Sequence, residues 1–167
     1  YTEENDPYVH GRSTPLIADL NGDGRPEVIV PSSTKSAGNN NFALRPNTFI
    51  TKNLVVLDGM TGRFKYVIET CDFQVHGQPI CIADADKDGK AEIYILSIGA
   101  RTTSSKQQYG DKFLYCYDGS KKNSSKDDYK WKSDRDMKFT FIPMIADINN
   151  DGFVEVVCGG CGFNAIT

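Results

Sequence analysis

The chain has 167 residues, of which 39% are hydrophobic and 25% are charged, a composition typical of a single soluble globular domain. Its apolar runs are far shorter than the roughly 18 residues that a membrane-spanning helix needs. With 19 basic and 22 acidic residues the formal net charge is −3, which argues against a nucleic-acid partner bound through a basic face. The sequence begins at Tyr1 without an apolar leader, and we expect either that a secretory signal has been removed or that this is a piece of a longer chain.

Three acidic segments share the pattern D-x-[DN]-x-D-G-x-x-E and begin at Asp19, Asp84 and Asp147. Their starts lie 65 and then 63 residues apart, and a fixed period of this size is typical of a repeat protein. Each segment stands between two short apolar runs, which predict strands. Because successive residues in these runs are apolar, both faces of the strands should be buried. The runs lie at 15–18, 79–83 and 143–146 before the acidic segments, and at 28–30, 93–96 and 156–158 after them.

The second half of the period repeats as well. Apolar runs at 54–57 and 113–117 are each followed by Asp-Gly, which is a hairpin signal. Fourth strands are then predicted at 64–68 and 129–131, so each period holds about four strands and no helix. The remaining polar segments predict loops at 32–52, 99–112 and 119–128.

One four-stranded antiparallel sheet per repeat, buried on both faces, is typical of a β-propeller blade. The sequence therefore predicts an all-β fold with two full blades and part of a third, at about 13–70, 77–135 and 141–167. A closed propeller needs about four to eight blades. We therefore expect a segment of a larger propeller, completed by blades from the parent chain or from another subunit.

The acidic pattern also suggests a metal site. Alternate positions 1, 3 and 5 place oxygen atoms on one side of a tight loop, and glycine at position 6 permits a positive φ. Position 7 can then offer its carbonyl, and Glu at position 9 can complete the shell. Hard oxygen ligands in flexible number favour Ca²⁺ over Mg²⁺. The EF-hand and dockerin-type loops are excluded, because position 12 should then be Glu, whereas it is Val30, Ile95 and Cys158 in the three copies.

The motif P-x-x-A-D-x-N-x-D-G-x-x-[DE]-[VI], repeated about every 60 residues, resembles the FG-GAP/VCBS repeat of integrin-α-like β-propellers. The resemblance covers nearly the whole chain and implies up to three Ca²⁺ sites. The implied ligands of the first site are the side chains of Asp19, Asn21, Asp23 and Glu27 and the carbonyl of Arg25. Those of the second are Asp84, Asp86, Asp88 and Glu92 and the carbonyl of Lys90. Those of the third are Asp147, Asn149, Asp151 and Glu155 and the carbonyl of Phe153.

This sequence departs from the family in its closing acid, which is Glu where many members have Asp. The segment 58–62, Asp-Gly-Met-Thr-Gly, also looks like a strand turn of quinoprotein-type propellers. Among the three implied sites the second is the most acidic, with four carboxylates against three in each of the others. More anionic ligands bind calcium more tightly, so the second site is predicted to be the tightest.

Five cysteines cannot all pair within one chain. Cys71 and Cys81 lie on either side of a blade junction and could pair across it, while Cys116 is expected in the core. Cys158 and Cys161 could form a local disulfide or remain buried thiols. A zinc site would need two further ligands at matched spacing, which the sequence does not offer.

Other residues favour structural roles. His10 and His76 each precede a blade and are expected to pack or form hydrogen bonds, since no catalytic triad accompanies them. Asn123-Ser-Ser forms a glycosylation sequon in a predicted loop. Trp131 is expected to pack in the core or at a blade edge rather than to stack on a sugar.

These observations predict a calcium-binding propeller segment of an extracellular, cell-surface or periplasmic protein, serving adhesion, ligand binding or assembly. Its protein or carbohydrate ligand would lie on a propeller face built from the loops at 32–52 and 99–112, and no membrane insertion is expected. The alternative is the propeller part of a secreted polysaccharide lyase or another carbohydrate-active enzyme, for which the sequence specifies no catalytic residues. A spacer in a surface filament is a third possibility.

Overall fold

The described residues of the computed structural model form strands and no helix. The predicted loops at 32–52 and 99–112 fall largely outside these residues, as do His10, His76 and Cys161. In this part of the chain there is no helix of the length and apolarity that crossing a bilayer demands. The structure describes residues 8–9, 14–33, 50–74, 80–97, 112–123, 125–134, 143–158 and 164–166.

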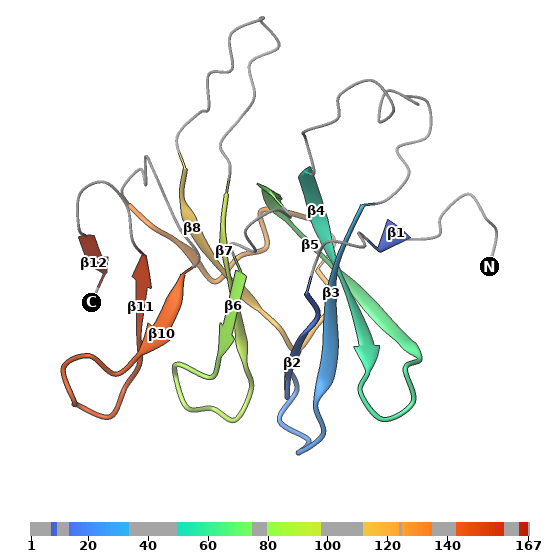
Figure 1. Cartoon of the computed structure of the whole chain (residues 1–167), viewed down its shortest axis with the longest axis horizontal. Coiled ribbons are helices and arrows are strands. Elements are labelled where there is room, and N and C mark those ends of the chain that lie inside the picture. The colour runs from blue at the N-terminus through green and yellow to red at the C-terminus, as the bar shows by residue number, and fades with distance from the viewer. Residues whose placement is uncertain are drawn as a thin grey trace, which may run out of the picture.

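The strands form three antiparallel sheets that stand side by side (Figure 1). From β2 onward each sheet follows the chain order that the repeats predict, so that consecutive strands of one sheet are neighbours. Sheet one consists of β2 (Leu16–Ala18), β3 (Glu27–Ser33), β4 (Ile50–Asp58) and β5 (Phe64–Gln74), with β1 (Tyr8–Val9) added beside the end of β3. Sheet two consists of β6 (Ile80–Ala83), β7 (Glu92–Leu96), β8 (Leu114–Asp118) and β9 (Trp131–Lys132). Sheet three consists of β10 (Met144–Ala146), β11 (Glu155–Cys158) and β12 (Asn164–Ile166).

Strand β7 shows why the apolar runs do not alternate with polar residues. All five of its residues are buried. Ile93 and Ile95 pack into a hydrophobic cluster with sheet one, and Tyr94 and Leu96 pack into a second cluster with sheet three. Because successive strand side chains point to opposite faces, a sheet covered on both sides needs apolar residues at every position. The predicted burial of both faces is therefore confirmed for this central strand.

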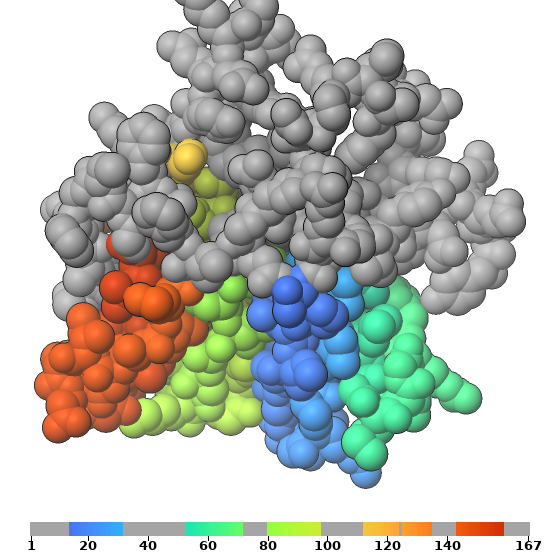
Figure 2. Space-filling view, viewed as in Figure 1, coloured from blue at the N-terminus to red at the C-terminus, as the bar shows by residue number. Residues whose placement is uncertain are grey.

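The sheets stack face to face as β-propeller blades. Strand β6 of sheet two contacts β2 of sheet one and β10 of sheet three, and β5 contacts β7. The two hydrophobic clusters fill the two junctions between sheets. In Figure 2 the described parts of the sheets appear as adjacent columns in blue to green, yellow-green and orange. The prediction of an all-β propeller with two four-stranded blades and part of a third is confirmed in this form, with β1 as an unpredicted addition to sheet one.

The two Asp-Gly hairpins form as expected. In the first, Oδ1 of Asp58 accepts hydrogen bonds from the N–H groups of Met60 and Thr61, at 3.1 and 2.7 Å, and the Gly62 N–H closes the turn on the Asp58 carbonyl. In the second, Oδ1 of Asp118 accepts from the Ser120 N–H at 2.8 Å. These turns bring the fourth strand of each blade back beside the third.

The described cysteines are divided between the two hydrophobic clusters. The possible disulfide between Cys71 and Cys81 is not formed, because Cys71 belongs to the cluster between sheets one and two, whereas Cys81 packs against the cluster between sheets two and three. Cys116 is buried in the core, as predicted. Cys158 is also a buried free thiol.

The segment 119–128 is only partly a solvated loop. Lys121 and Lys122 are exposed, but Asn123 is only 8% exposed. Its Nδ2 donates to the Glu69 carbonyl of the neighbouring blade at 2.8 Å. Since Nδ2 is the atom that a glycan would modify, this sequon serves packing between blades.

Candidate metal centre

The three acidic segments form loops between the first and second strands of each blade, and Figure 1 shows them along the same edge of the molecule. We call them loop one (19–27), loop two (84–92) and loop three (147–155). In loop one the Gly24 N–H donates to Oδ2 of Asp19 at 2.8 Å, and the same bond measures 2.9 Å in loop two and 2.8 Å in loop three. The glycine φ angles are 80°, 86° and 90°, a region that favours glycine. This explains glycine at position 6.

Two further hydrogen bonds recur in all three loops. The N–H of position 7 donates to the carboxylate of position 5 at 2.8 Å in each copy. The N–H of position 5 donates to the side-chain oxygen of position 3, at 2.9, 3.3 and 2.9 Å. The backbone thus fixes the side chains at positions 1, 3 and 5 from within the loop, before any ligand is considered.

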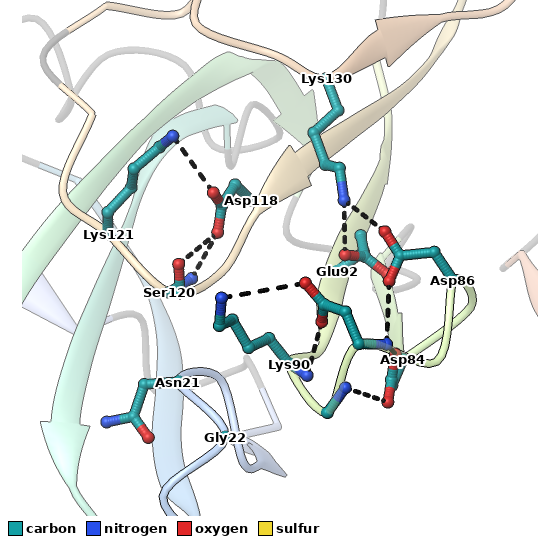
Figure 3. A network of polar contacts seen from close by, with 12 residues as sticks. Asn21, Gly22, Asp84, Asp86, Lys90, Glu92, Asp118, Ser120, Lys121 and Lys130 are labelled. Carbon is teal, nitrogen blue, oxygen red and sulfur yellow. Dashed lines mark hydrogen bonds and ion pairs between the residues drawn. The ribbon is translucent and has the colours of Figure 1, made fainter.

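Loop two gathers the densest carboxylate group in the described part of the chain. Asp84, Asp86 and Asp88 each place an oxygen so that all three atoms lie within 4.8 Å of one another, and all three residues are exposed. Asp84 and Asp86 are labelled in Figure 3. An all-oxygen donor set on a loop that wraps round one point fits a hard divalent cation.

Loops one and three carry asparagine at position 3. In loop one Nδ2 of Asn21 donates to Oδ2 of Asp23 at 3.1 Å. In loop three Nδ2 of Asn149 donates to Oδ2 of Asp151 at 3.0 Å and to Oε1 of Glu155 at 3.2 Å. These loops therefore share the backbone geometry of loop two but hold one fewer carboxylate.

Backbone donors also lower the pKa of the first aspartate in loop one. Desolvation is the largest single influence on Asp19 and raises its pKa, but the N–H groups of Gly24, Gly22, Asn21 and Asp23 together outweigh it, so the net shift is downward. The carboxylate is thereby kept in its charged, metal-binding form.

The glutamate at position 9 closes each loop. Its Oε2 accepts the N–H of position 2, at 2.9 Å in loop one, 3.1 Å in loop two and 2.9 Å in loop three. Glu27 and Glu92 are only 2% and 4% exposed, and Glu92 lies outside the group formed by the three aspartates of loop two. The structure thus brings positions 1, 3 and 5 together and uses position 9 to join the two ends of the loop.

Two lysines that the sequence analysis did not identify reach these glutamates. Lys65 Nζ lies 2.6 Å from Oε1 of Glu27. Lys130 Nζ lies 2.8 Å from Oε1 of Glu92 and 2.9 Å from Oδ2 of Asp86 (Figure 3). Each lysine stands 38 residues after its glutamate, and this shared separation is the signal that could have revealed them.

The carboxylates raise the lysine pKa values. Hydrogen bonding to Glu27 is the largest influence on Lys65, and hydrogen bonding first to Glu92 and then to Asp86 raises the pKa of Lys130. In return, the hydrogen bond from Lys130 lowers the pKa of Asp86. Lys130, which lies outside loop two, thus forms ion pairs with two of its carboxylates.

Neighbouring loops contact one another. The Ala91 N–H, at the end of loop two, donates to the Asp19 carbonyl of loop one at 3.1 Å. Lys87 of loop two lies over the Phe153 ring of loop three, with Nζ 4.3 Å from the ring centroid. An ion that orders one loop would therefore also order its contact with the next blade.

The side chain of Trp131 lies at a blade edge. Trp131 on β9 is 38% exposed, and its ring lies 5.8 Å from that of Tyr94, between centroids. This contact is the edge packing that the sequence analysis favoured.

Among solved structures, the chain resembles the crystal structure of the exotype rhamnogalacturonan lyase YesX, with a TM-score of 0.56 and 15% sequence identity. The match covers 93% of this chain but only 31% of the lyase. No family model matches the sequence, and no curated protein does. At this identity the likeness concerns the fold, and it agrees with the blade architecture derived above.

Proposed function

We propose that this chain is a calcium-binding β-propeller segment of the FG-GAP/VCBS type, in which up to three ions fasten neighbouring blades. The observation that carries the proposal is the group of carboxylate oxygens from Asp84, Asp86 and Asp88, within 4.8 Å of one another. The same backbone hydrogen bonds recur in loops one and three. The side chains at positions 1, 3 and 5 are the ligands best placed to hold the ion, with the carbonyl of position 7 as a further candidate.

The ion's role would be structural. Metal binding to the folded state alone stabilises it by mass action, by about 2.7 kcal/mol per site when free calcium is a hundred times the dissociation constant. Carboxylates held within one loop repel one another, and in loop two Lys130 offsets only part of their negative charge. A divalent cation removes that repulsion at the edge where the blades meet.

The test is thermal unfolding of the chain in calcium and in a chelator. We expect calcium to raise the Tm, and we expect Asp84→Asn to reduce that rise by removing a ligand. Asp127→Asn, which changes an exposed acid outside the loops, is the matched control and should keep the full rise. An unchanged Tm in calcium, with the chain folded, would contradict the proposal.

The setting that suits such sites is extracellular, at the cell surface or in the periplasm, where calcium is abundant. A role in adhesion or assembly through a protein or carbohydrate ligand stays a prediction from the sequence. The second candidate is the propeller part of a carbohydrate-active enzyme, and the observation favouring it is the likeness to a rhamnogalacturonan lyase. Incubation with rhamnogalacturonan separates the two: unsaturated products support the enzyme, and binding without cleavage supports the binding module.

A further inference from the structure

We propose that Lys130 is a built-in counter-ion that weakens calcium binding at loop two, so that this loop is not the tightest site despite its extra carboxylate. The inference rests on the proposed calcium binding and adds the residue that sets the affinity of one site. It reverses the ranking that carboxylate counting alone predicts.

The ammonium group of Lys130 contacts the carboxylate at position 3 of loop two. Lys130 Nζ lies 2.9 Å from Oδ2 of Asp86, and the other oxygen of the same carboxylate accepts the Asp88 N–H at 3.3 Å. Both oxygens of Asp86 are therefore engaged. Asp86 is also the residue that distinguishes loop two, since the other loops carry asparagine at this position.

Loop one has a corresponding lysine, but among the acids of that loop this lysine contacts only the glutamate at position 9. Lys65 occupies the equivalent place on the fourth strand and binds Oε1 of Glu27 at 2.6 Å. Position 3 is Asn21, whose Nδ2 donates to Asp23. The lysine contact with position 3 thus accompanies the acidic residue there, and Lys130 matches the additional negative charge of loop two. Lys90 adds a longer contact with Asp88, at 3.9 Å.

The positive charge of Lys130 opposes the binding of a cation at loop two. An ion bound among Asp84, Asp86 and Asp88 would share the Asp86 carboxylate with the ammonium group and be repelled by it. The Lys130 side chain is 37% exposed, so water screens part of this repulsion. Charges of +2 and +1 about 5 Å apart in a watery dielectric still weaken binding by roughly tenfold.

The test is a calcium titration of the chain with ¹⁵N-labelled glycine, followed by NMR. The amides of Gly24, Gly89 and Gly152 each donate to the first aspartate of their own loop, so each reports one site. In Lys130→Met we expect the affinity reported by Gly89 to rise about tenfold, with the other two unchanged. Lys65→Met is the matched control, and it should alter the affinity reported by Gly24 by less.

If Lys130→Met does not fold, substitution of Asp86 tests the same inference. Asp86→Asn removes a carboxylate that is already paired with Lys130, so it should weaken calcium binding at loop two only slightly, whereas Asp84→Asn should weaken it strongly. When Lys130→Met is combined with Asp86→Asn, the rise in calcium affinity caused by Lys130→Met should be smaller than in the single variant. An unchanged or lower affinity in Lys130→Met, or a large loss in Asp86→Asn, would overturn the inference. If no glycine amide shifts with calcium in any variant, the proposed function itself has failed.

Discussion

The two blade junctions are built from the same repeat but differ in their contacts. Between sheets one and two, polar bonds cross the interface around a hydrophobic cluster. The Tyr66 hydroxyl donates to the Gly119 carbonyl at 2.7 Å, and the Cys71 N–H donates to the Tyr117 hydroxyl at 2.8 Å. Asn123 adds its bond to Glu69.

Between sheets two and three, the described contacts are mainly apolar. Three thiols, those of Cys81, Cys116 and Cys158, lie in or against this cluster. Burial raises the pKa of both Cys81 and Cys116 to about 12, so they stay neutral and pack as small hydrophobic groups. The acidic loops are therefore alike in all three blades, whereas the polar bonds between blades differ from one junction to the other.

The largest expected effect comes from Gly119→Ala at the first junction. A Cβ on this residue would lie 2.5 Å from the Ala91 carbonyl oxygen and 2.6 Å from Cδ2 of Leu20 in the neighbouring blade. Leu20 is fully buried, so it has little room to move, and we expect a loss of about 3 kcal/mol in the free energy of unfolding. Urea unfolding followed by the fluorescence of Trp131 measures it. Gly62→Ala, where the added Cβ meets no other atom but the backbone φ is 67°, should cost only the strain of that backbone, about 1 kcal/mol, and equal losses would contradict the account.

A smaller effect is expected from Tyr117→Phe at the same junction. The change leaves the buried Cys71 N–H without the hydroxyl that accepts its hydrogen bond, which should cost about 2 kcal/mol. The matched control is Tyr115→Phe, because the Tyr115 ring stacks on Tyr117 with centroids 6.1 Å apart, while the Cys71 N–H donates to the hydroxyl of Tyr117 and not to that of Tyr115. The same urea experiment applies, and a control that loses as much stability as Tyr117→Phe would show that the bond to Cys71 is not the cause.

The smallest effect is expected at the second junction, from Lys87→Met. The lysine lies over the ring of Phe153, which is 53% exposed, and an exposed cation–π contact contributes about 0.5 kcal/mol. Unfolding should be measured without calcium, because Lys87 lies within loop two. Lys122→Met, at an exposed lysine outside the loops, is the control. A loss as large as that of Tyr117→Phe would mean that polar contacts stabilise the two junctions equally.

Much of the fold follows from local pattern. The apolar runs and the Asp-Gly turns place the strands, since strands and hairpins depend on residues close in sequence. The consecutive apolar residues of 93–96 indicate a strand covered on both faces, and the structure confirms it. The acidic loops are likewise local, because their hydrogen bonds join residues no more than seven apart.

The contacts that the sequence did not indicate join distant residues. Lys130 reaches Asp86 across 44 positions, and Asn123 reaches Glu69 across 54. Such contacts depend on the register between strands and on the packing of one blade against another, neither of which a local pattern fixes. The absence of a disulfide between Cys71 and Cys81 has the same cause, because blade packing places them at different junctions.

The most direct test of calcium as the fastener between blades is hydrogen exchange at the Ala91 amide. This N–H belongs to loop two and donates to the Asp19 carbonyl of loop one, so its protection reports the contact between the two blades. The account predicts slow exchange in calcium and much faster exchange in a chelator. Equal protection of the Ala91 amide in both conditions would contradict the claim that metal in these loops holds the blades together.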